Sequence, residues 1–188
     1  MGKKISIDSA TMMNKVYEVI EAKNIFDFDY KNIKIIIHPK SYVHALLKFN
    51  NGMIKIIVHE TTMKIPIFNT IYSDYSKTIK SKKINLNNLN NLSFKEINYR
   101  RYPMVKLLDL LPQKQSLFET VIVSANDAFV KLFLENKIKF IDIQKKLFSL
   151  IKRHEFKKYK KNSPKNIKDI IDLNDYVRSK ILKKVYKT

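Results

Sequence analysis

The chain has no cysteine and only two glycines among its 188 residues. Without cysteine it can form no disulfide framework, no thiolate nucleophile and no cysteine zinc site. Two glycines are too few for a glycine-rich phosphate loop of the dinucleotide-binding or Walker A kind, so nucleotide binding by such a loop is excluded within this chain. The apolar runs are also far shorter than the roughly 20 residues that a membrane-spanning helix needs. We therefore expect no transmembrane helix.

Positively charged residues dominate the charged residues of the chain. Lysine and arginine outnumber aspartate and glutamate by 37 to 17, which gives a formal net charge of +20. Hydrophobic residues make up 45% of the chain, enough for a folded core, and this excludes wholesale disorder. The four lysines within 157–161 keep open an alternative, a basic protein that binds nucleic acid or an anionic membrane. Because basic residues are dispersed over the whole chain, we interpret them as a solvated face and expect neither partner.

The spacing of apolar residues predicts a mixed first half. The elements expected there are a helix at 8–24, strands at 33–38, 42–49 and 53–59, and a loop with a short element at 61–72. Asp8 or Ser9 would cap the helix, whose apolar residues recur at helical spacing. The Asn-Asn-Gly turn at 50–52 would join the last two strands as an antiparallel hairpin. The three strands together would form a β-meander.

The second half is predicted to be helical. Residues 73–98 are polar and lack a hydrophobic period, so we expect a connecting segment with at most a short strand at 92–94. A domain boundary is expected near 99–103. The helices expected beyond it lie at 105–111, 117–135, 140–156 and 167–186. The predicted fold class is α+β, with a helix and a β-meander followed by a C-terminal helical bundle.

Four polar residues near the N-terminus form the candidate site. On a helix that starts near Ser9, Asn14 and Glu18 are four residues apart and can reach one side together with Lys15. The free N–H groups at such a helix start can cradle a phosphate between Ser9, Asn14 and Lys15. The carboxylate of Glu18, one turn on, could hold a hard cation such as Mg²⁺. The alternative is a capped amphipathic helix with a Lys15–Glu18 surface ion pair worth a few tenths of a kcal/mol.

Three sequence blocks carry a resemblance. Residues 2–18 read Gly-Lys-Lys-Ile-Ser-Ile-Asp-Ser-Ala-Thr-Met-Met-Asn-Lys-Val-Tyr-Glu, residues 37–44 read Ile-His-Pro-Lys-Ser-Tyr-Val-His, and residues 62–67 read Thr-Met-Lys-Ile-Pro-Ile. In order and interval these blocks resemble deoxyxylulose-phosphate reductoisomerases, the NADPH-dependent enzymes of non-mevalonate isoprenoid biosynthesis. Residues 124–128 and 137–142 are similar to the C-terminal bundle of that family. The first block is long and specific, so chance is a poor explanation.

The resemblance implies a reaction, its cofactors and a set of site residues. The substrate 1-deoxy-D-xylulose 5-phosphate would be rearranged on Mg²⁺ or Mn²⁺ and reduced by NADPH to 2-C-methyl-D-erythritol 4-phosphate. The implied roles are substrate binding by Ser9, Asn14, Lys15 and Glu18, metal binding by Glu18, NADPH contact by Gly2 and Met63, and a catalytic position for His44. For His44 the alternative is a strand histidine that pairs with a neighbour, and for Met63 it is plain core packing.

The resemblance also implies a domain division and a homodimer. Residues 1–72 would be the later part of the catalytic domain, which binds substrate and metal and dimerises through the meander. Residues 73–98 would be a linker and residues 99–188 the helical bundle. The partners expected are a phosphorylated sugar and a second copy of the chain. The compartment would be a plastid of the apicoplast type in a eukaryote and the cytoplasm otherwise.

Two departures from the family pattern limit what this chain does alone. The family begins with a dinucleotide-binding domain that has no counterpart here, and Glu18 by itself cannot hold a catalytic Mg²⁺. We therefore expect a fragment of the enzyme that is inactive alone. Val16 stands where the family usually has glycine. The start Met1–Ser6 also fits an N-myristoylation pattern, which we interpret as a coincidence because the family block explains the same residues.

Overall fold

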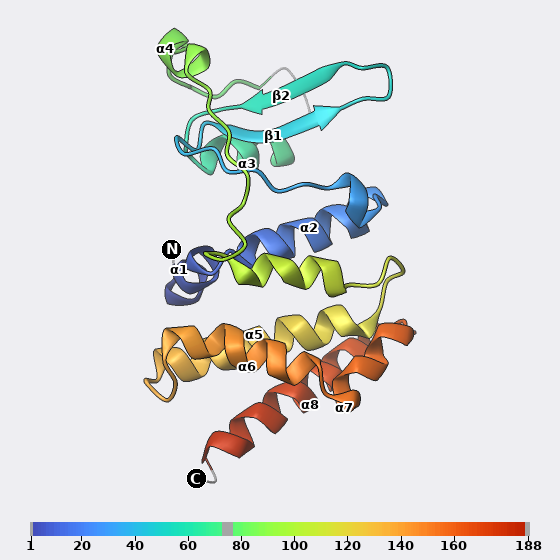
Figure 1. Cartoon of the computed structure of the whole chain (residues 1–188). Helices are drawn as coiled ribbons and strands as arrows, with labels where there is room; N and C mark the ends of the chain where they lie inside the picture. The colour runs from blue at the N-terminus through green and yellow to red at the C-terminus, as the bar shows by residue number, and fades with distance from the viewer. Residues whose placement is uncertain (1, 73–76, 187–188) are drawn as a thin grey trace. The chain divides into compact units, whose positions relative to one another are not determined.

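The computed structural model describes residues 2–72 and 77–186, with side chains as far as residue 183 (Figure 1). The chain forms two compact units. Residues 1–34 and 98–188 make up the helical unit, and residues 35–97 make up the hairpin unit. The described ranges contain helices and one small antiparallel sheet, so the predicted α+β class is confirmed. None of the helices in these ranges is both long and apolar enough to span a bilayer.

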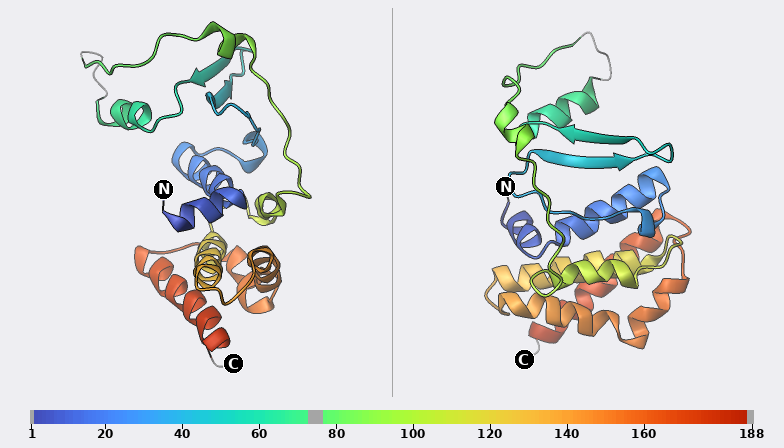
Figure 2. Two further views of the ribbon diagram at one scale, coloured as in Figure 1. Left: turned by 90° about the vertical axis from the view of Figure 1, so that its left-hand side faces the viewer. Right: turned by 45° about the horizontal axis from the view of Figure 1, so that its top comes forward.

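Helix α5 is the centre of the helical unit. The elements of this unit are α1 (Lys3–Ala10), α2 (Met13–Phe26), η1 (Tyr30–Asn32), η2 (Pro103–Leu110), α5 (Leu117–Leu134), α6 (Phe140–Ile151), α7 (His154–Lys157), η3 (Lys158–Lys161) and α8 (Ile167–Tyr186). Helix α6 runs beside α5, whereas α8 lies obliquely to it (Figure 2). The Ser116 Oγ caps α5 by accepting a hydrogen bond from the Phe118 N–H at 3.3 Å. Most side chains of α5 are buried, as expected for a predominantly apolar helix at the centre of a unit.

The helical prediction for the second half is largely confirmed, with two differences. The helix predicted at 140–156 is divided into α6 and α7, because Arg153 has an extended backbone with ψ at 140°. The helix predicted at 105–111 is the 3₁₀ helix η2, which begins earlier, with Pro103 at its first position. A proline fits there because its missing N–H needs no partner.

The single helix predicted at 8–24 is wrong, because α1 and α2 meet at a kink. Met12 has a φ of 60°, in the left-handed region that a non-glycine residue adopts only at a cost. Thr11 Oγ1 donates to the Asp8 carbonyl oxygen at 3.2 Å and accepts from the Met13 N–H at 3.4 Å. Asp8 therefore lies in the last turn of α1 and does not cap a helix start. The apolar spacing of the sequence continues across the kink, so periodicity alone could not reveal it.

The hairpin unit contains a predicted hairpin and two helices that the sequence did not predict. Its elements are β1 (Val43–Lys48), β2 (Ile54–Val58), α3 (Lys64–Ile71) and α4 (Leu86–Asn90). The strands pair antiparallel through the predicted turn, where Gly52 has a φ of 88° and its N–H donates to the Phe49 carbonyl at 3.0 Å. Only glycine adopts this φ without strain. Pro66 lies in the first turn of α3, where a proline is tolerated.

The predicted third strand at 33–38 is wrong. Ile37 forms one isolated bridge with Lys95, through backbone hydrogen bonds of 2.8 and 2.9 Å. In the described residues, its neighbours along the chain belong to no β-ladder. The meander is therefore a two-stranded hairpin in the described residues. The strand expected at 92–94 is also absent there, and the bridge partner is the residue after it. Residues 73–76, part of the predicted connecting segment, lie outside the described residues.

The compact units differ from the division at residues 72 and 98 that the resemblance implies. The predicted boundary after residue 98 lies one residue beyond Ile97, where the hairpin unit ends, but residues 1–34 group with the helical half. The reason is that α1 and α2 pack against α5 and η2. The division into a catalytic portion, a linker and a bundle stays a prediction.

A buried polar cluster joins α2, η1 and α5. The Tyr30 hydroxyl donates to Glu119 Oε1 at 2.8 Å, and Lys23, itself buried, lies over the Tyr30 ring at 5.7 Å. Burial raises the pKa of Glu119 above its usual value, and the hydrogen bond from Tyr30 and the charge of Lys23 offset only part of this rise. We therefore expect the stability of the fold to depend on the protonation of Glu119.

Replacing Glu119 with glutamine should change that pH dependence. Because the folded-state pKa of Glu119 is raised, protonation of Glu119 stabilises the fold. This stabilisation is fully present below the unfolded-state pKa, about 4.3, and is lost as the pH rises through the folded-state pKa. Glutamine has no proton to lose, so the free energy of unfolding of Glu119→Gln should rise relative to that of the wild type as the pH increases above about 4. Urea titrations across this range measure it. Glu135→Gln, at the exposed end of α5, is the control, and a Glu119→Gln difference independent of pH would contradict the prediction.

Candidate functional site

The α1–α2 kink brings the predicted substrate-binding residues together. Ser9 is in the last turn of α1 and Asn14 in the first turn of α2, and Asn14 Nδ2 donates to Ser9 Oγ at 2.8 Å. Lys15 follows on the exposed side of the same turn. Ser9 was predicted at the start of a helix, and its place at the end of one is a correction. The shared face of Ser9, Asn14, Lys15 and Glu18 is nevertheless formed, because the kink folds the two helix ends toward each other.

Glu18 pairs with Lys15 on this face. Lys15 Nζ lies 2.7 Å from Glu18 Oε2, and the Glu18 side chain is 56% exposed. This is the surface ion pair that the sequence left open as the alternative. Among the described residues no group of three or more His, Asp, Glu or Cys side chains is placed to hold a metal ion. These residues alone therefore do not fit a catalytic divalent cation, for which Glu18 offers one carboxylate ligand.

A buried polar network that the sequence did not predict lies beside the exposed face. Asp8 is 1% exposed and Asn126 of α5 is fully buried. Asn126 Nδ2 donates to Asp8 Oδ1 at 2.8 Å and to the Tyr17 hydroxyl oxygen at 2.9 Å. Burial raises the pKa of Tyr17, and the nearby carboxylates of Asp8 and Asp127 add to the rise. The available signal was a single asparagine among the apolar residues of 121–132.

Lys4 links the same network to its charged rim. Its Nζ lies 2.7 Å from Asp8 Oδ2 and 3.0 Å from Asp127 Oδ1, and Arg178 of α8 lies 3.8 Å from Asp127 Oδ2. Burial opposes the charge on Lys4, but the two carboxylates outweigh it and hold the pKa of Lys4 above its usual value. The buried carboxylate of Asp8 is thus compensated by a cation and an amide, as a buried charge requires.

His44 occupies a β-bulge in the hairpin unit. Val43 pairs with Val58 and Ala45 with Ile57, so the register of the strands shifts at His44. Its ring stacks on that of His59 with centroids 3.6 Å apart, and its Nε2 lies 3.2 Å from the His59 carbonyl oxygen. The structure therefore shows a strand histidine paired with a neighbour. The catalytic role of His44 stays a prediction.

The two residues predicted to contact NADPH lie in different units. Gly2 precedes α1, and its carbonyl oxygen accepts from the Ser6 N–H at 3.3 Å. Met63 precedes α3 and is 69% exposed, so the alternative of plain core packing is wrong for it. An exposed thioether is free to contact a ligand. Neither residue forms part of a glycine-rich cradle, since the chain has only two glycines.

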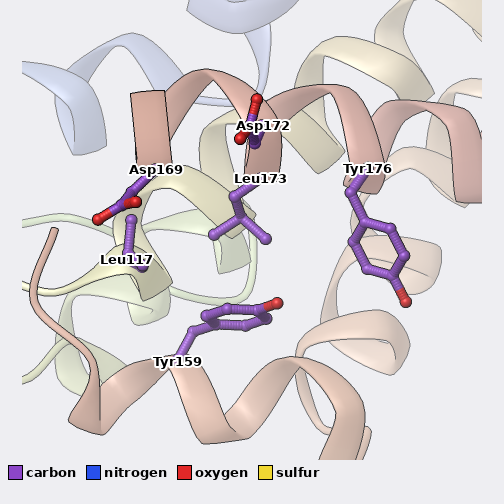
Figure 3. Close-up of a pocket in the computed structure, with 6 residues that line it drawn as sticks. All are labelled: Leu117, Tyr159, Asp169, Asp172, Leu173 and Tyr176. Atoms are coloured by element: carbon purple, nitrogen blue, oxygen red, sulfur yellow. The ribbon is translucent and has the colours of Figure 1, made fainter. Parts of the chain in front are cut away.

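A cavity of about 290 Å³ lies elsewhere in the helical unit, at the start of α5 beside η3 and α8. Its lining residues are Leu117, Tyr159, Asp169, Asp172, Leu173 and Tyr176, and Leu173 points toward the Tyr159 ring (Figure 3). Its two carboxylates already have partners. Asp172 pairs with Lys168 at 2.6 Å, and Asp169 accepts from the Lys165 N–H at 2.8 Å. None of the predicted site residues lines this cavity.

Comparison with known families identifies the class. The family model described as "DXP reductoisomerase C-terminal domain" matches residues 59–180, and that described as "1-deoxy-D-xylulose 5-phosphate reductoisomerase C-terminal domain" matches residues 1–26. Both describe C-terminal domains of a reductoisomerase. The second match contains the whole polar face between Ser9 and Glu18. The chain belongs to the 1-deoxy-D-xylulose 5-phosphate reductoisomerase family, which confirms the resemblance.

Individual relatives support the same assignment. The chain is 58% identical over 181 residues to the enzyme of Pelagibacter ubique (strain HTCC1062), a match that covers 96% of this chain and 47% of the relative. It is 34% identical to the enzyme of Sulfurihydrogenibium sp. (strain YO3AOP1), covering 98% of this chain and 48% of the relative. The chain thus spans about half the length of the curated relatives that it matches.

Solved reductoisomerase structures share the fold. One, in complex with NADPH, fosmidomycin and magnesium, has a TM-score of 0.85 and 29% identity and covers 99% of this chain and 47% of that chain. Another, the Zymomonas mobilis enzyme in complex with NADPH, has a TM-score of 0.79 and 27% identity and covers 97% of this chain and 47% of that chain. These related structures contain the cofactors, NADPH and magnesium, that the resemblance implies.

Proposed function

We propose that this chain supplies substrate-binding and metal-binding residues to a reductoisomerase that converts 1-deoxy-D-xylulose 5-phosphate to 2-C-methyl-D-erythritol 4-phosphate. The observation that carries the proposal is the exposed face of Ser9, Asn14, Lys15 and Glu18, which lies within a segment matched by the family model. A hydroxyl, an amide and an ammonium group are the donors that a phosphate dianion accepts from. In this proposal Ser9, Asn14 and Lys15 bind the substrate phosphate.

Glu18 is proposed to contribute one carboxylate to the substrate and to a Mg²⁺ or Mn²⁺ ion. A divalent metal polarises adjacent substrate oxygens as a Lewis acid. Because the described residues supply no further cluster of ligands, the remaining ones would come from outside them. His44 is proposed as the catalytic histidine, and Gly2 and Met63 as contacts to NADPH. The bacterial relatives support a cytoplasmic setting over the plastid alternative.

A chimera tests this function. It joins the part of the Pelagibacter ubique enzyme that this chain does not cover to the 188 residues of this chain. NADPH oxidation is measured with deoxyxylulose phosphate and Mg²⁺ for the chain alone and for the chimera. We expect turnover by the chimera only, because two glycines are too few for a nucleotide loop and the described residues offer no cluster of metal ligands.

The alternative of a basic binding protein predicts a different result. An inert chimera, together with salt-sensitive retention of DNA by the chain, would replace the enzyme proposal with nucleic-acid binding. That retention would have to fall when the four lysines of 157–161 are neutralised.

The hairpin is proposed to join two copies of the chain. Leu46 pairs with Ile56, and Lys48 pairs with Ile54, on one face of the hairpin. The side chains of Leu46, Ile54 and Ile56 are exposed. An exposed apolar patch of this kind marks an interaction surface. The homodimer implied by the resemblance would bury it.

A lysine in this patch should therefore weaken association. We expect the wild-type chain to sediment as a dimer and Ile56→Lys to raise the dissociation constant at least about tenfold, because a charge would be buried at the interface. Lys55→Gln, on the opposite face of the same strand, should leave association unchanged. A wild-type chain that stays monodisperse and monomeric at high concentration would contradict this proposal.

A further inference from the structure

We propose that Asn126 and Asp8 are positioning residues that hold the α1–α2 kink in the form in which Ser9 and Asn14 face the substrate phosphate. This inference rests on the proposed function, and neither residue lies on the exposed face that would bind the phosphate. The feature that suggests it is a single side-chain amide, on a helix more than a hundred residues further along the chain, that bonds to both helices of the kink.

The two hydrogen bonds of Asn126 define the relative placement of α1 and α2. One N–H of its amide donates to Asp8, the residue before Ser9, and the amide also donates to Tyr17, the residue before Glu18. Each helix of the kink is therefore held next to a residue of the candidate site. An asparagine side chain is short and planar, so satisfying both acceptors leaves little freedom in the angle between the helices.

Because these polar groups are buried, losing their hydrogen bonds is costly. Asp8 and Asn126 are almost completely shielded from water, and a buried polar group that loses its partner costs roughly 1–3 kcal/mol. The kink itself is unfavourable, since Met12 has a φ of 60° without being a glycine. A strained conformation of this kind persists only where its surroundings determine it. The Asp8–Asn126–Tyr17 contacts are such surroundings, and Lys4 completes the charge balance of Asp8 at 2.7 Å.

The arrangement has a function beyond stability because Ser9 and Asn14 meet only across the kink. Their 2.8 Å hydrogen bond links residues on either side of Met12. A change of the kink angle would separate the hydroxyl from the amide and would disperse the donors for a phosphate. Donors that are held in place before the ligand arrives bind more tightly, since less ordering remains to be done.

The test compares phosphate binding in variants of the full 188-residue chain. Inorganic phosphate is titrated into the ¹⁵N-labelled protein, and NMR follows the backbone amides of 9–15 and the Asn14 side-chain amide. Asn126→Asp places two carboxylates together at Asp8, and we expect phosphate affinity to fall at least about tenfold. Tyr17→Phe removes one of the two contacts and keeps the ring, so it should fold and lose affinity about threefold. It keeps the test decisive if Asn126→Asp does not fold.

A reciprocal exchange and a matched control separate positioning from stability. In Asp8→Asn combined with Asn126→Asp, the new amide at position 8 can donate to the new carboxylate at position 126, so affinity should return to within about threefold of the wild type. The control is Ser124→Ala. Ser124 is buried on the same helix and donates to Asn174 of α8 at 2.8 Å, so it should lower the melting temperature but leave phosphate affinity unchanged.

The outcomes distinguish this inference from the proposed function. Wild-type affinity in Asn126→Asp or Tyr17→Phe would overturn the inference and leave the proposed function standing. If Ser124→Ala lowers phosphate affinity in proportion to its loss of stability, the effect of Asn126 is one of folding alone. That result would also overturn the inference. If phosphate does not perturb 9–15 in the wild type, the substrate-binding role itself fails and the inference fails with it.

Discussion

Replacing Glu18 with glutamine should lower the turnover of the reductoisomerase chimera at least about 100-fold. Glutamine keeps the size and the exposed position of the side chain but removes its charge. Hard divalent cations bind carboxylate oxygens far better than a neutral amide, so the proposed metal would be held more weakly and its effect on substrate oxygens would be reduced. The measurement is the rate of NADPH oxidation with saturating deoxyxylulose phosphate over a range of Mg²⁺ concentrations.

The matched control for this prediction is Glu21→Gln. Glu21 is exposed on the same helix, three residues further on, and no role is predicted for it. We expect its chimera to keep the wild-type rate. If Glu18 has only its observed ion pair with Lys15, its replacement costs a few tenths of a kcal/mol and changes the rate less than about twofold. Turnover of Glu18→Gln within that limit would contradict a metal-binding role.

The Lys15–Glu18 ion pair does not conflict with ligand binding. Both side chains are about half exposed, and exposed pairs of this kind contribute only about 0–1 kcal/mol. Separating them therefore costs little. In the proposed complex the ammonium group would turn to the substrate phosphate and the carboxylate to the metal ion. The pair keeps the two opposite charges compensated in the protein without ligand.

The candidate site was readable from the sequence because its residues are close together along the chain. Ser9, Asn14, Lys15 and Glu18 lie within ten residues, so their closeness in space follows largely from their closeness along the chain, and the kink between α1 and α2 adds the contact of Ser9 with Asn14. The kink was not readable, since it depends on Asn126, a residue of a distant helix. Local spacing predicts which residues share a face, whereas tertiary contacts decide the angle between the helices that carry them.

The same difference explains the strands. The hairpin turn at 50–52 depends on local glycine chemistry and was predicted correctly. The run at 33–38 is rich in isoleucine and has the composition of a strand, but within the described residues its one bridge partner is Lys95, far along the chain. Strand formation depends on a neighbouring strand, which composition does not reveal. Helix α3 lies where a loop with a short element was expected, and its Pro66 does not interrupt it, because a proline in the first helical turn is tolerated.

Replacing Val16 with glycine should destabilise the helical unit by about 3 kcal/mol. The resemblance leads us to expect glycine at position 16, yet the Val16 side chain is completely buried in α2. Glycine would remove this buried side chain and leave a cavity, together worth about 2.5 kcal/mol, and would add the helix cost of a few tenths of a kcal/mol relative to valine. For a protein of this size the melting temperature should fall by about 6–12 °C.

Glu21→Gly separates the two contributions to this effect. Glu21 is exposed in the same helix, so its replacement should cost the helix propensity alone, less than about 1 kcal/mol. Urea titrations followed by far-UV circular dichroism measure both variants. Because the Val16 side chain points into the core while Lys15 and Glu18 are exposed, Val16→Gly should leave the KM of the chimera for deoxyxylulose phosphate unchanged. A lower KM together with unchanged stability would instead indicate that valine obstructs the ligand here, and that Val16 faces the site.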